Sequence, residues 1–294
     1  MQIIDNKALL LKLRDPSKVV ANIPKSKTVG DNQVVVNWGL DEAQSLRQLD
    51  IKAPSPIEGQ YKWTGRYKPF GHQVSTASFL TMHKRGFCFN EQGTGKTASA
   101  ISASDYLLKK GYINRVLVIC PLSIMDSAWR DDLFTFATHR TVSVAHGSAD
   151  KRKEIIAQGS EYVVINYDGI GIVLEELQKG GFDLIIVDEA THYKNARTTR
   201  WKNLFRLMKE DTWLWMMTGT PAAQNPTDAY GLAKLINPYG VPRFFGAFKD
   251  QVMFKVSQFT WKIKPTATDT VFKALQPAIR FTKDECLDYP QWCI

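Results

Sequence analysis

Short continuous apolar runs alternate with amphipathic stretches from about residue 60 to the end of the chain. The runs that predict strands span residues 86–89, 116–120, 142–145, 162–165, 184–187 and 213–217. Stretches between them, such as 97–108 and 151–157, have the spacing of helices. Strands that are apolar on both faces and separated by helices are typical of a parallel sheet with helices on both sides. Residues 61–294 are therefore predicted to form an α/β domain with a mostly parallel sheet, with its ligand sites at the carboxyl ends of the strands.

The first 60 residues follow a different pattern and are predicted to form a small accessory module. Apolar runs at 3–13 and 34–38 predict strands, and 40–49 has helical spacing. A proline-containing stretch then leads into the main domain. Two roles fit this segment: it extends a basic surface, or it covers an exposed edge of the sheet. The sequence leaves both roles open.

Composition is that of an ordinary globular protein with a positive charge. Of the 294 residues, 44% are hydrophobic and 23% are charged, and the formal net charge is +9. Such an excess of Lys and Arg is consistent with a polyanionic partner such as nucleic acid. No apolar stretch approaches the ~20 residues of a membrane span, and the N-terminus lacks a signal-peptide pattern. We therefore expect an intracellular protein with no membrane partner, and the compact accessory regions favour a bacterial or phage cytoplasm.

A phosphate cradle is predicted where the run 86–89 ends in a glycine-rich turn. The residues expected to bind a nucleotide there are Gln92, Gly93, Thr94, Gly95, Lys96 and Thr97. Gly93 and Gly95 permit backbone angles that point successive N–H groups into one nest. Lys96 can reach the outer phosphates, and the Thr97 hydroxyl can hold Mg²⁺. Asn90 departs from the eight-residue P-loop pattern, which begins with Gly, and an ordinary loop is the alternative for this turn.

Two adjacent acids directly follow the run 184–187. Asp188 and Glu189 would be costly at the end of a buried strand unless they take part in chemistry. Phosphoryl transfer fits: Asp188 would hold Mg²⁺, directly or through water, and Glu189 would polarise the attacking water. Together with Lys96 they are the candidate catalytic residues. The alternative is a strand that ends in a solvated acidic turn.

A polar segment also follows the apolar run 213–217. Thr218 and Thr220 place hydroxyls on either side of Gly219, and Pro221 prevents the strand from continuing. We expect these hydroxyls beside the γ-phosphate, although Thr-Gly-Thr-Pro on its own is usually a turn.

In this order, the Gly-Thr-Gly-Lys-Thr, Asp-Glu-Ala-x and Thr-Gly-Thr-Pro motifs resemble the first RecA-like lobe of superfamily 2 helicases. The finer pattern, from about residue 65 onward, is similar to the Swi/Snf-related group of double-stranded DNA translocases. The resemblance implies a RecA-like P-loop domain. It also implies a second RecA-like lobe in cis, which we do not expect the residues after Lys283 to encode.

Shorter segments carry the same resemblance. Residues 69–73 resemble the adenine-reading motif, which makes Gln73 the expected base contact. Residues 120–123 resemble the Pro-x-Ser segment of the group, and 280–285 resemble the Arg-x-Thr-Lys segment that leads out of the first lobe. By resemblance, the residues expected to contact DNA or to couple it to ATP are Pro121, Ser123, Asn166, Tyr167, Lys194, Asn195, Thr218, Gly219 and Thr220.

The sequence also departs from the family pattern. Thr191 replaces the His of the acidic box, which puts in doubt a hydrogen-bond relay from there to the Thr-Gly-Thr motif. Gln224 stands where the family usually has Asn, and Asp132 stands where it has Glu. For Trp129 and Tyr167 taken singly, core packing is the alternative to a functional role.

The resemblance implies ATP and Mg²⁺ as cofactors and double-stranded DNA as a partner, contacted through its phosphates without sequence preference. The expected function is that of the ATP-binding lobe of a DNA-dependent ATPase that translocates on or remodels DNA. Without the second lobe and its arginine finger we expect little turnover. The alternatives are a nucleotide-gated DNA-binding module without turnover and a superfamily 2 helicase of another group.

Overall fold

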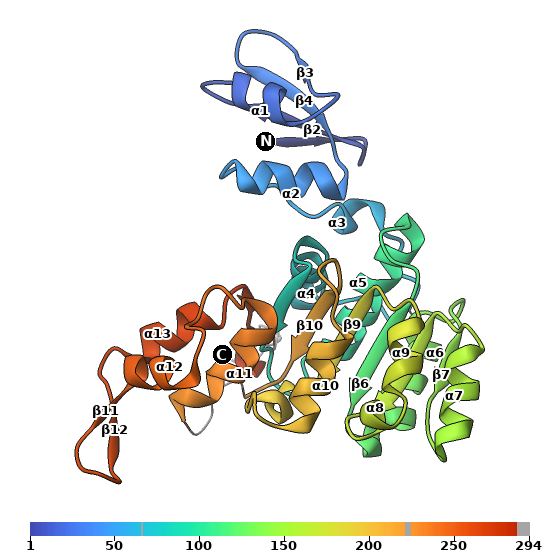
Figure 1. The fold of residues 1–294 in the computed structure, drawn as a ribbon. Coiled ribbons are helices and arrows are strands. Elements are labelled where there is room, and N and C mark those ends of the chain that lie inside the picture. Colours follow the sequence, from blue (N-terminus) through green and yellow to red (C-terminus); the bar gives the residue numbers. More distant parts are fainter. Residues whose placement is uncertain (66, 221–224, 287–294) are drawn as a thin grey trace, which may run out of the picture.

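The computed structural model describes residues 1–65, 67–220 and 225–286. Its main element is a seven-stranded sheet in the order β13-β5-β10-β9-β6-β8-β7, in which every neighbouring pair is parallel (Figure 1). The strands are β5 (Arg85–Cys88), β6 (Val116–Cys120), β7 (Val142–Val144), β8 (Tyr162–Asn166), β9 (Leu184–Asp188), β10 (Trp213–Met217) and β13 (Ala278–Ile279). The predicted parallel sheet is confirmed, and each predicted strand is present. Within this sheet, only the short edge strand β13 had no counterpart among the predicted strands.

Helices cover both faces of this sheet because its strands contribute alternate residues to two cores. In β9, Leu184 and Ile186 belong to one hydrophobic cluster, and Ile185 and Val187 belong to the other. The first cluster includes α4 (Gly71–Met82), α5 (Lys96–Lys110) and α6 (Asp131–Phe136). The second includes α7 (Ala149–Ala157), α8 (Gly169–Ile172), α9 (Leu174–Lys179), α10 (Thr199–Leu207), α11 (Ala229–Ile236), α12 (Phe245–Val252) and α13 (Ala267–Ala274). Burial on both faces explains why the strands are continuously apolar.

Short helical segments follow several strands. They are η1 (Leu122–Ile124) and the π-helix η2 (Met125–Arg130) after β6, η3 (Ala190–Tyr193) after β9, η4 (Pro226–Asp228) before α11, and α14 (Lys283–Cys286) after β13.

The N-terminal residues form a separate four-stranded antiparallel sheet in the order β1-β2-β4-β3. Its elements, with the helices that accompany them, are β1 (Gln2–Ile4), β2 (Ala8–Lys12), α1 (Ser17–Asn22), β3 (Lys27–Thr28), β4 (Gln33–Asn37), α2 (Leu40–Gln48) and α3 (Ile57–Gln60). The single strand predicted over 3–13 is wrong, because the chain turns back at Asp5 and Asn6, whose φ angles are 49° and 52°. Asp and Asn adopt this left-handed conformation more readily than most residues, and it suits a tight hairpin.

This N-terminal module lies at the end of α5 that is remote from the glycine-rich turn (Figure 1). Lys110, the last residue of α5, donates from Nζ to Gln60 Oε1 at 2.9 Å. A helix of 15 residues is about 22 Å long. The module therefore packs far from the phosphate cradle, and whether it contacts DNA stays a prediction.

A two-stranded hairpin projects from the other side of the domain (Figure 1). It consists of β11 (Met253–Lys255) and β12 (Trp261–Ile263), which pair with each other and with no other described strand. None of the helices in the described ranges combines the length and apolar character that a membrane crossing needs.

Candidate nucleotide site

Three of the predicted motifs meet at the carboxyl edge of the sheet. Strand β10 lies between β5 and β9, and Met217 is level with both Cys88 and Asp188. The next residue, Thr218, donates its backbone N–H to the Cys88 carbonyl at 3.0 Å. The glycine-rich turn, the acidic pair and the Thr-Gly-Thr motif therefore begin at neighbouring positions, as expected for parallel strands.

The glycine-rich turn has the backbone that a phosphate cradle needs. Gly93 and Gly95 have φ angles of 85° and 77°, and Gly95 is the N-cap residue of α5. A Cβ on Gly95 would collide with the end of the Gln73 side chain, and the positive φ itself disfavours any residue that has a side chain. Lys96 donates from Nζ to the Glu91 carbonyl at 3.1 Å. The turn thus places Lys96 and the N-terminus of a long helix together, an arrangement that attracts phosphate.

Asn90 shows why this turn can depart from the usual first glycine. Its side chain is 1% exposed and bridges two elements. Its Nδ2 donates to Thr76 Oγ1 of α4 at 2.8 Å, and its Oδ1 accepts from the Phe281 N–H at 3.0 Å. Asn90 therefore fixes the start of the cradle against α4 and against the segment that follows β13. This role of Asn90 was not predicted from the sequence.

The segment after β13 runs alongside the residues that lead into the cradle. Backbone N–H groups of Phe87, Phe89 and Glu91 donate to the carbonyls of Pro277, Ile279 and Phe281 at 2.8–3.0 Å. The Glu91 carboxylate accepts from the Lys283 N–H at 3.0 Å and lies 4.0 Å from the Arg280 guanidinium. The side chain of Lys283 also reaches the cradle, because its Cε lies 3.7 Å from where a Cβ on Gly93 would be.

Gln73 lies between the cradle and a neighbouring cavity. Its Oε1 accepts from the Phe70 N–H at 3.0 Å, and its Nε2 lies against Gly95, on the side where a Cβ would be. A cavity of about 170 Å³ beside it is lined by aromatic rings, including Trp63 and Phe136, and by Ser99 of α5. Aromatic walls with a few polar groups suit a planar base, so this cavity fits the predicted base contact of Gln73.

The acidic pair is built into the structure and is not a solvated turn. Asp188 is 7% exposed; its Oδ2 accepts from Trp129 Nε1 at 2.9 Å and its Oδ1 from the Glu189 N–H at 3.0 Å. Burial raises the pKa of Asp188 above its usual value, and the Trp129 hydrogen bond is the largest influence in the opposite direction. Each carboxylate oxygen still has acceptor capacity. A buried carboxylate with free acceptor sites fits a magnesium ligand.

Glu189 is placed by an uncommon backbone conformation. Its φ is 51°, in the left-handed region that side chains other than Gly, Asn and Asp rarely adopt. Thr218 Oγ1 donates to Glu189 Oε2 at 3.4 Å and accepts from the Thr220 N–H at 3.2 Å. The acidic box therefore contacts the Thr-Gly-Thr motif through Glu189, so the link does not require a histidine in the position of Thr191.

Trp129 and Tyr167 are both buried and both hold the acidic pair. Trp129 is 0% exposed and lies on the π-helix η2, a kind of bulge that is frequent at functional sites. The Tyr167 hydroxyl donates to the Asp188 carbonyl at 2.5 Å. The core-packing alternative therefore describes their burial correctly but misses their hydrogen bonds to the site. Only the resemblance to a known family pointed to these two residues.

Gly219 packs directly against the cradle. A Cβ on Gly219 would lie 3.4 Å from the Gln92 backbone nitrogen. The Thr-Gly-Thr motif and the glycine-rich turn thus touch through their backbones. Pro221 and Gln224 lie outside the described residues.

The remaining predicted contacts lie along the same edge of the sheet but are separate from the cradle. Pro121 and the exposed Ser123 follow β6, and Asn166 ends β8, where its Oδ1 accepts from Arg152 Nη1 at 3.0 Å. Lys194 pairs with Asp228 at 3.0 Å, and Asn195 accepts from the Arg197 N–H and stabilises the turn before α10. Their assignment as DNA or coupling contacts stays a prediction.

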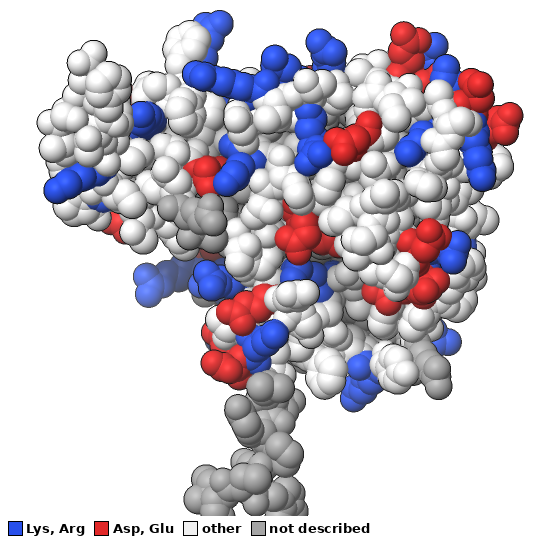
Figure 2. Space-filling model, turned by 90° about the horizontal axis from the view of Figure 1, so that it is seen from below, with Lys and Arg blue, Asp and Glu red and all other residues white. Residues whose placement is uncertain are grey.

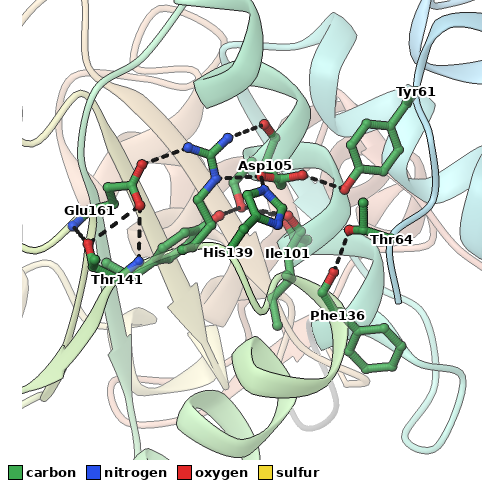
Figure 3. Close-up of polar contacts among 12 residues, drawn as sticks. Tyr61, Thr64, Ile101, Asp105, Phe136, His139, Thr141 and Glu161 are labelled. Atoms are coloured by element: carbon green, nitrogen blue, oxygen red, sulfur yellow. Dashed lines mark hydrogen bonds and ion pairs between the residues drawn. The ribbon is translucent and has the colours of Figure 1, made fainter. Parts of the chain in front are cut away.

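A buried polar cluster on α5 was not predicted (Figure 3). Asp105, 1% exposed, accepts from the Tyr61 hydroxyl at 2.7 Å, from Arg140 Nε at 2.5 Å and from His139 at 2.9 Å. Arg140 also pairs with Glu161 at 2.6 Å. Burial, and then the Asp105 charge, raise the pKa of Tyr61. Tyr61 follows the N-terminal module, and its hydrogen bond to Asp105 holds this part of the chain against α5. The other end of α5 lies at the cradle.

Comparison with known proteins gives a consistent result. A family model described as the SNF2-related domain matches residues 32–279, and the match begins inside the N-terminal module. Helicase SWR1 of Saccharomyces cerevisiae is 26% identical over 206 residues, which are 68% of this chain and 13% of that protein. The chromatin-remodeling ATPase INO80 of Aspergillus terreus is 30% identical over 211 residues, 66% of this chain and 12% of that protein.

A solved structure shares the fold. The Sulfolobus solfataricus SWI2/SNF2 ATPase core in complex with dsDNA aligns with a TM-score of 0.64 and 23% identity, over 75% of this chain and 46% of that one. The chain thus spans less than half of that structure and a smaller part of the curated relatives. Both curated relatives are eukaryotic, so they give no support to the expected bacterial or phage origin.

Proposed function

The chain belongs to the SNF2-related domain family, and from this premise we propose that it is the ATP-binding lobe of a DNA-dependent ATPase that translocates on or remodels double-stranded DNA. The observation that carries the proposal is the meeting of the cradle, the acidic pair and the Thr-Gly-Thr motif at one edge of the sheet. These are the groups that phosphoryl transfer needs: a phosphate site, a metal ligand and a group that orients water.

Each residue of the site has a defined task in this proposal. Lys96 would exchange the Glu91 carbonyl for the outer phosphates, and Thr97 and Asp188 would hold Mg²⁺. The metal, when bound, neutralises phosphate charge. Glu189 polarises the attacking water, and Thr218 keeps the Glu189 carboxylate in place through the hydrogen bond at 3.4 Å.

Three features support nucleic acid as the partner. The net charge is +9, the solved Sulfolobus relative is described as a complex with dsDNA, and Lys and Arg side chains gather on the edge that carries the site. Figure 2 views this edge and shows blue side chains concentrated along its upper left, with acidic side chains mainly in the middle and at the right. Contacts with phosphates make binding sensitive to salt and nearly independent of sequence.

We further propose that the protein acts inside the cell and that turnover requires a second RecA-like lobe in cis. Besides Lys96, the basic residues Arg280 and Lys283 lie close to the cradle, and Arg280 is engaged with Glu91. An arginine finger from another lobe typically contributes ~10³ to 10⁵ in rate. The lobe alone should therefore bind MgATP and hydrolyse it slowly.

Thermal unfolding with MgATP tests the nucleotide site. A ligand at about 100 times its Kd stabilises a protein by about 2.7 kcal/mol, which raises Tm by about 4 °C at this size. We expect this shift in the parent and not in Lys96→Ala. The matched control is Lys109→Ala, an exposed lysine at the far end of the same helix. Equal shifts in all three proteins would contradict the cradle.

A second measurement tests the activity. Steady-state phosphate release is compared between residues 1–294 and a two-lobed form of the protein, each with and without duplex DNA. We expect DNA-stimulated release only from the two-lobed form. If the two-lobed form binds ATP and DNA without turnover, the nucleotide-gated binding module replaces the ATPase as the function.

A further inference from the structure

We propose that the hairpin β11–β12 is a second DNA contact, in which Phe259 at its tip stacks on a base exposed where a duplex frays or branches. The inference rests on the proposed function, because it takes DNA to be the partner of this lobe. None of the motifs of the nucleotide site includes this hairpin.

The hairpin projects into solvent and exposes apolar side chains. It extends away from the body of the domain beyond α12 and α13 (Figure 1). Phe259, in the loop between its strands, is 88% exposed, and Val256 and Ile263 are more than half exposed. Side chains this exposed contribute little to the stability of the domain, so folding does not account for an aromatic residue at the tip.

Lysines and aromatic rings alternate across the two strands. Phe254 is opposite Lys262, and Lys255 is opposite Trp261. Lys249 of α12 adds a third pairing, with its Nζ 3.7 Å from the centre of the Trp261 ring. The Trp261 ring thus lies beside an ammonium group, and Lys255 and Lys262 are exposed and available to an anion.

The charge of this region is of one sign. The sequence has no Asp or Glu between Asp250 and Asp269, whereas Lys255, Lys262 and Lys264 lie in that stretch. A polyanion is complementary to such a surface. Among polyanions, nucleic acids alone also offer flat aromatic bases, on which exposed phenyl rings stack without sequence preference. DNA therefore matches both the charge and the exposed rings.

The hairpin is also connected to the predicted DNA contacts by basic residues on α12 and beside it. Arg197, two residues after Asn195, lies 5.7 Å from the ring of Phe245 at the start of α12. Arg243 stacks on Phe244 at 5.4 Å. The hairpin lies at the left of the view in Figure 2, next to the region where blue side chains gather. A DNA molecule on that region would pass close to the hairpin.

The test is DNA binding by residues 1–294, measured by fluorescence anisotropy with a blunt duplex, a forked duplex and a single strand of equal length. We expect Phe259→Ala to weaken binding to the fork about five- to tenfold and to the blunt duplex less than twofold. Phe259→Trp should restore the fork affinity, because it keeps a stacking surface. Phe134→Ala, which removes an exposed ring from α6, is the matched control and should bind all three like the parent.

A second variant measures the contribution of the lysines to DNA binding separately from that of the Phe259 ring. Lys255→Ala combined with Lys262→Ala should weaken binding to all three DNAs. On duplex DNA it should also lower the slope of log affinity against log salt by about 0.9 for each phosphate that the protein no longer neutralises. If the parent binds no DNA, the proposed function fails. If the parent binds and both hairpin variants bind like it, only the hairpin contact is refuted, as it would be if this surface served a protein partner.

Discussion

Replacing Trp129 with Phe isolates the hydrogen bond that holds Asp188. The change keeps an aromatic ring but removes the indole N–H, which donates to the Asp188 carboxylate at 2.9 Å. A hydrogen bond to a charged group contributes about 1.5–3 kcal/mol, whereas one between neutral groups contributes about 0.5–1.5 kcal/mol. The smaller ring adds a further cost because the site is fully buried.

Trp215→Phe is the matched control for the loss of buried side-chain volume. Trp215 is equally buried, and its indole donates to the neutral His83 carbonyl at 3.1 Å. The two variants thus lose similar volume and one donor each, but only Trp129 has a carboxylate acceptor. At neutral pH we expect Trp129→Phe to be less stable than Trp215→Phe by about 1–2 kcal/mol, the difference between the two kinds of hydrogen bond.

The way this stability difference changes with pH tests whether Trp129 holds the ionised form of Asp188. Asp188 has a folded-state pKa raised above 3.8, so its contribution to stability is full below that pH and is lost as the pH rises through the folded-state pKa. Removing the Trp129 hydrogen bond, which opposes the shift, raises that pKa further. The deficit of Trp129→Phe relative to Trp215→Phe should therefore be small near pH 4 and grow toward neutral pH.

Urea unfolding of both variants and the parent across this pH range measures the deficit. In an Asp188→Asn background the pH-dependent part of the difference should vanish. For each variant, the free energy of unfolding is plotted against pH. If the two plots run parallel from acidic to neutral pH, Trp129 is not the residue that holds the ionised carboxylate.

Three other variants test neighbouring parts of the site. Burial raises the pKa of Asp132 to about 6, so the stability that this carboxyl contributes is full below pH 3.8 and is lost as the pH rises toward 6; Asp132→Asn should raise the urea midpoint at pH 8 and change it much less near pH 4. Glu189→Gln, in a two-lobed form of the protein, should retain ATP binding while phosphate release falls about 100-fold or more. Asn90→Gly restores the usual P-loop residue but removes two buried hydrogen bonds; we expect a loss of about 1–3 kcal/mol in urea unfolding and faster hydrogen exchange at the Phe281 amide. Protection of Phe281 equal to that of the parent would show that Asn90 does not hold this segment.

The strands were predictable because the signal for each is local. The run 184–187 is apolar at successive positions, since its two faces enter different cores. Strand β13 could not be found in this way, because it has two residues and owes its place to pairing with β5, far away in the sequence. The turn at Asp5 and Asn6 carried a local signal that the apolar residues on either side concealed.

In the site too, the parts with a local signal in the sequence were predictable and the others were not. The acidic pair follows an apolar run, and the cradle has a recognisable spacing, so both could be placed from sequence. Their supporting partners could not, because Trp129 and Asp188 are 59 residues apart and Tyr61 and Asp105 are 44 residues apart. A buried tryptophan has the same pattern in sequence whether its N–H meets a carbonyl or a carboxylate.

The pairing of the cradle with the segment after β13 has a consequence for the newly made protein. The Asn90 side chain and the Phe281 amide are separated by 191 residues, so the ribosome completes the cradle long before its partner exists. Strand β5 pairs only with β10 and β13, which are both made later, and until β13 emerges the N–H groups of Phe87, Phe89 and Glu91 lack the acceptors that the finished fold provides. The growing chain therefore carries an incompletely paired phosphate-binding strand while the 191 residues between Asn90 and Phe281 are made, and in that interval we expect chaperones to matter most.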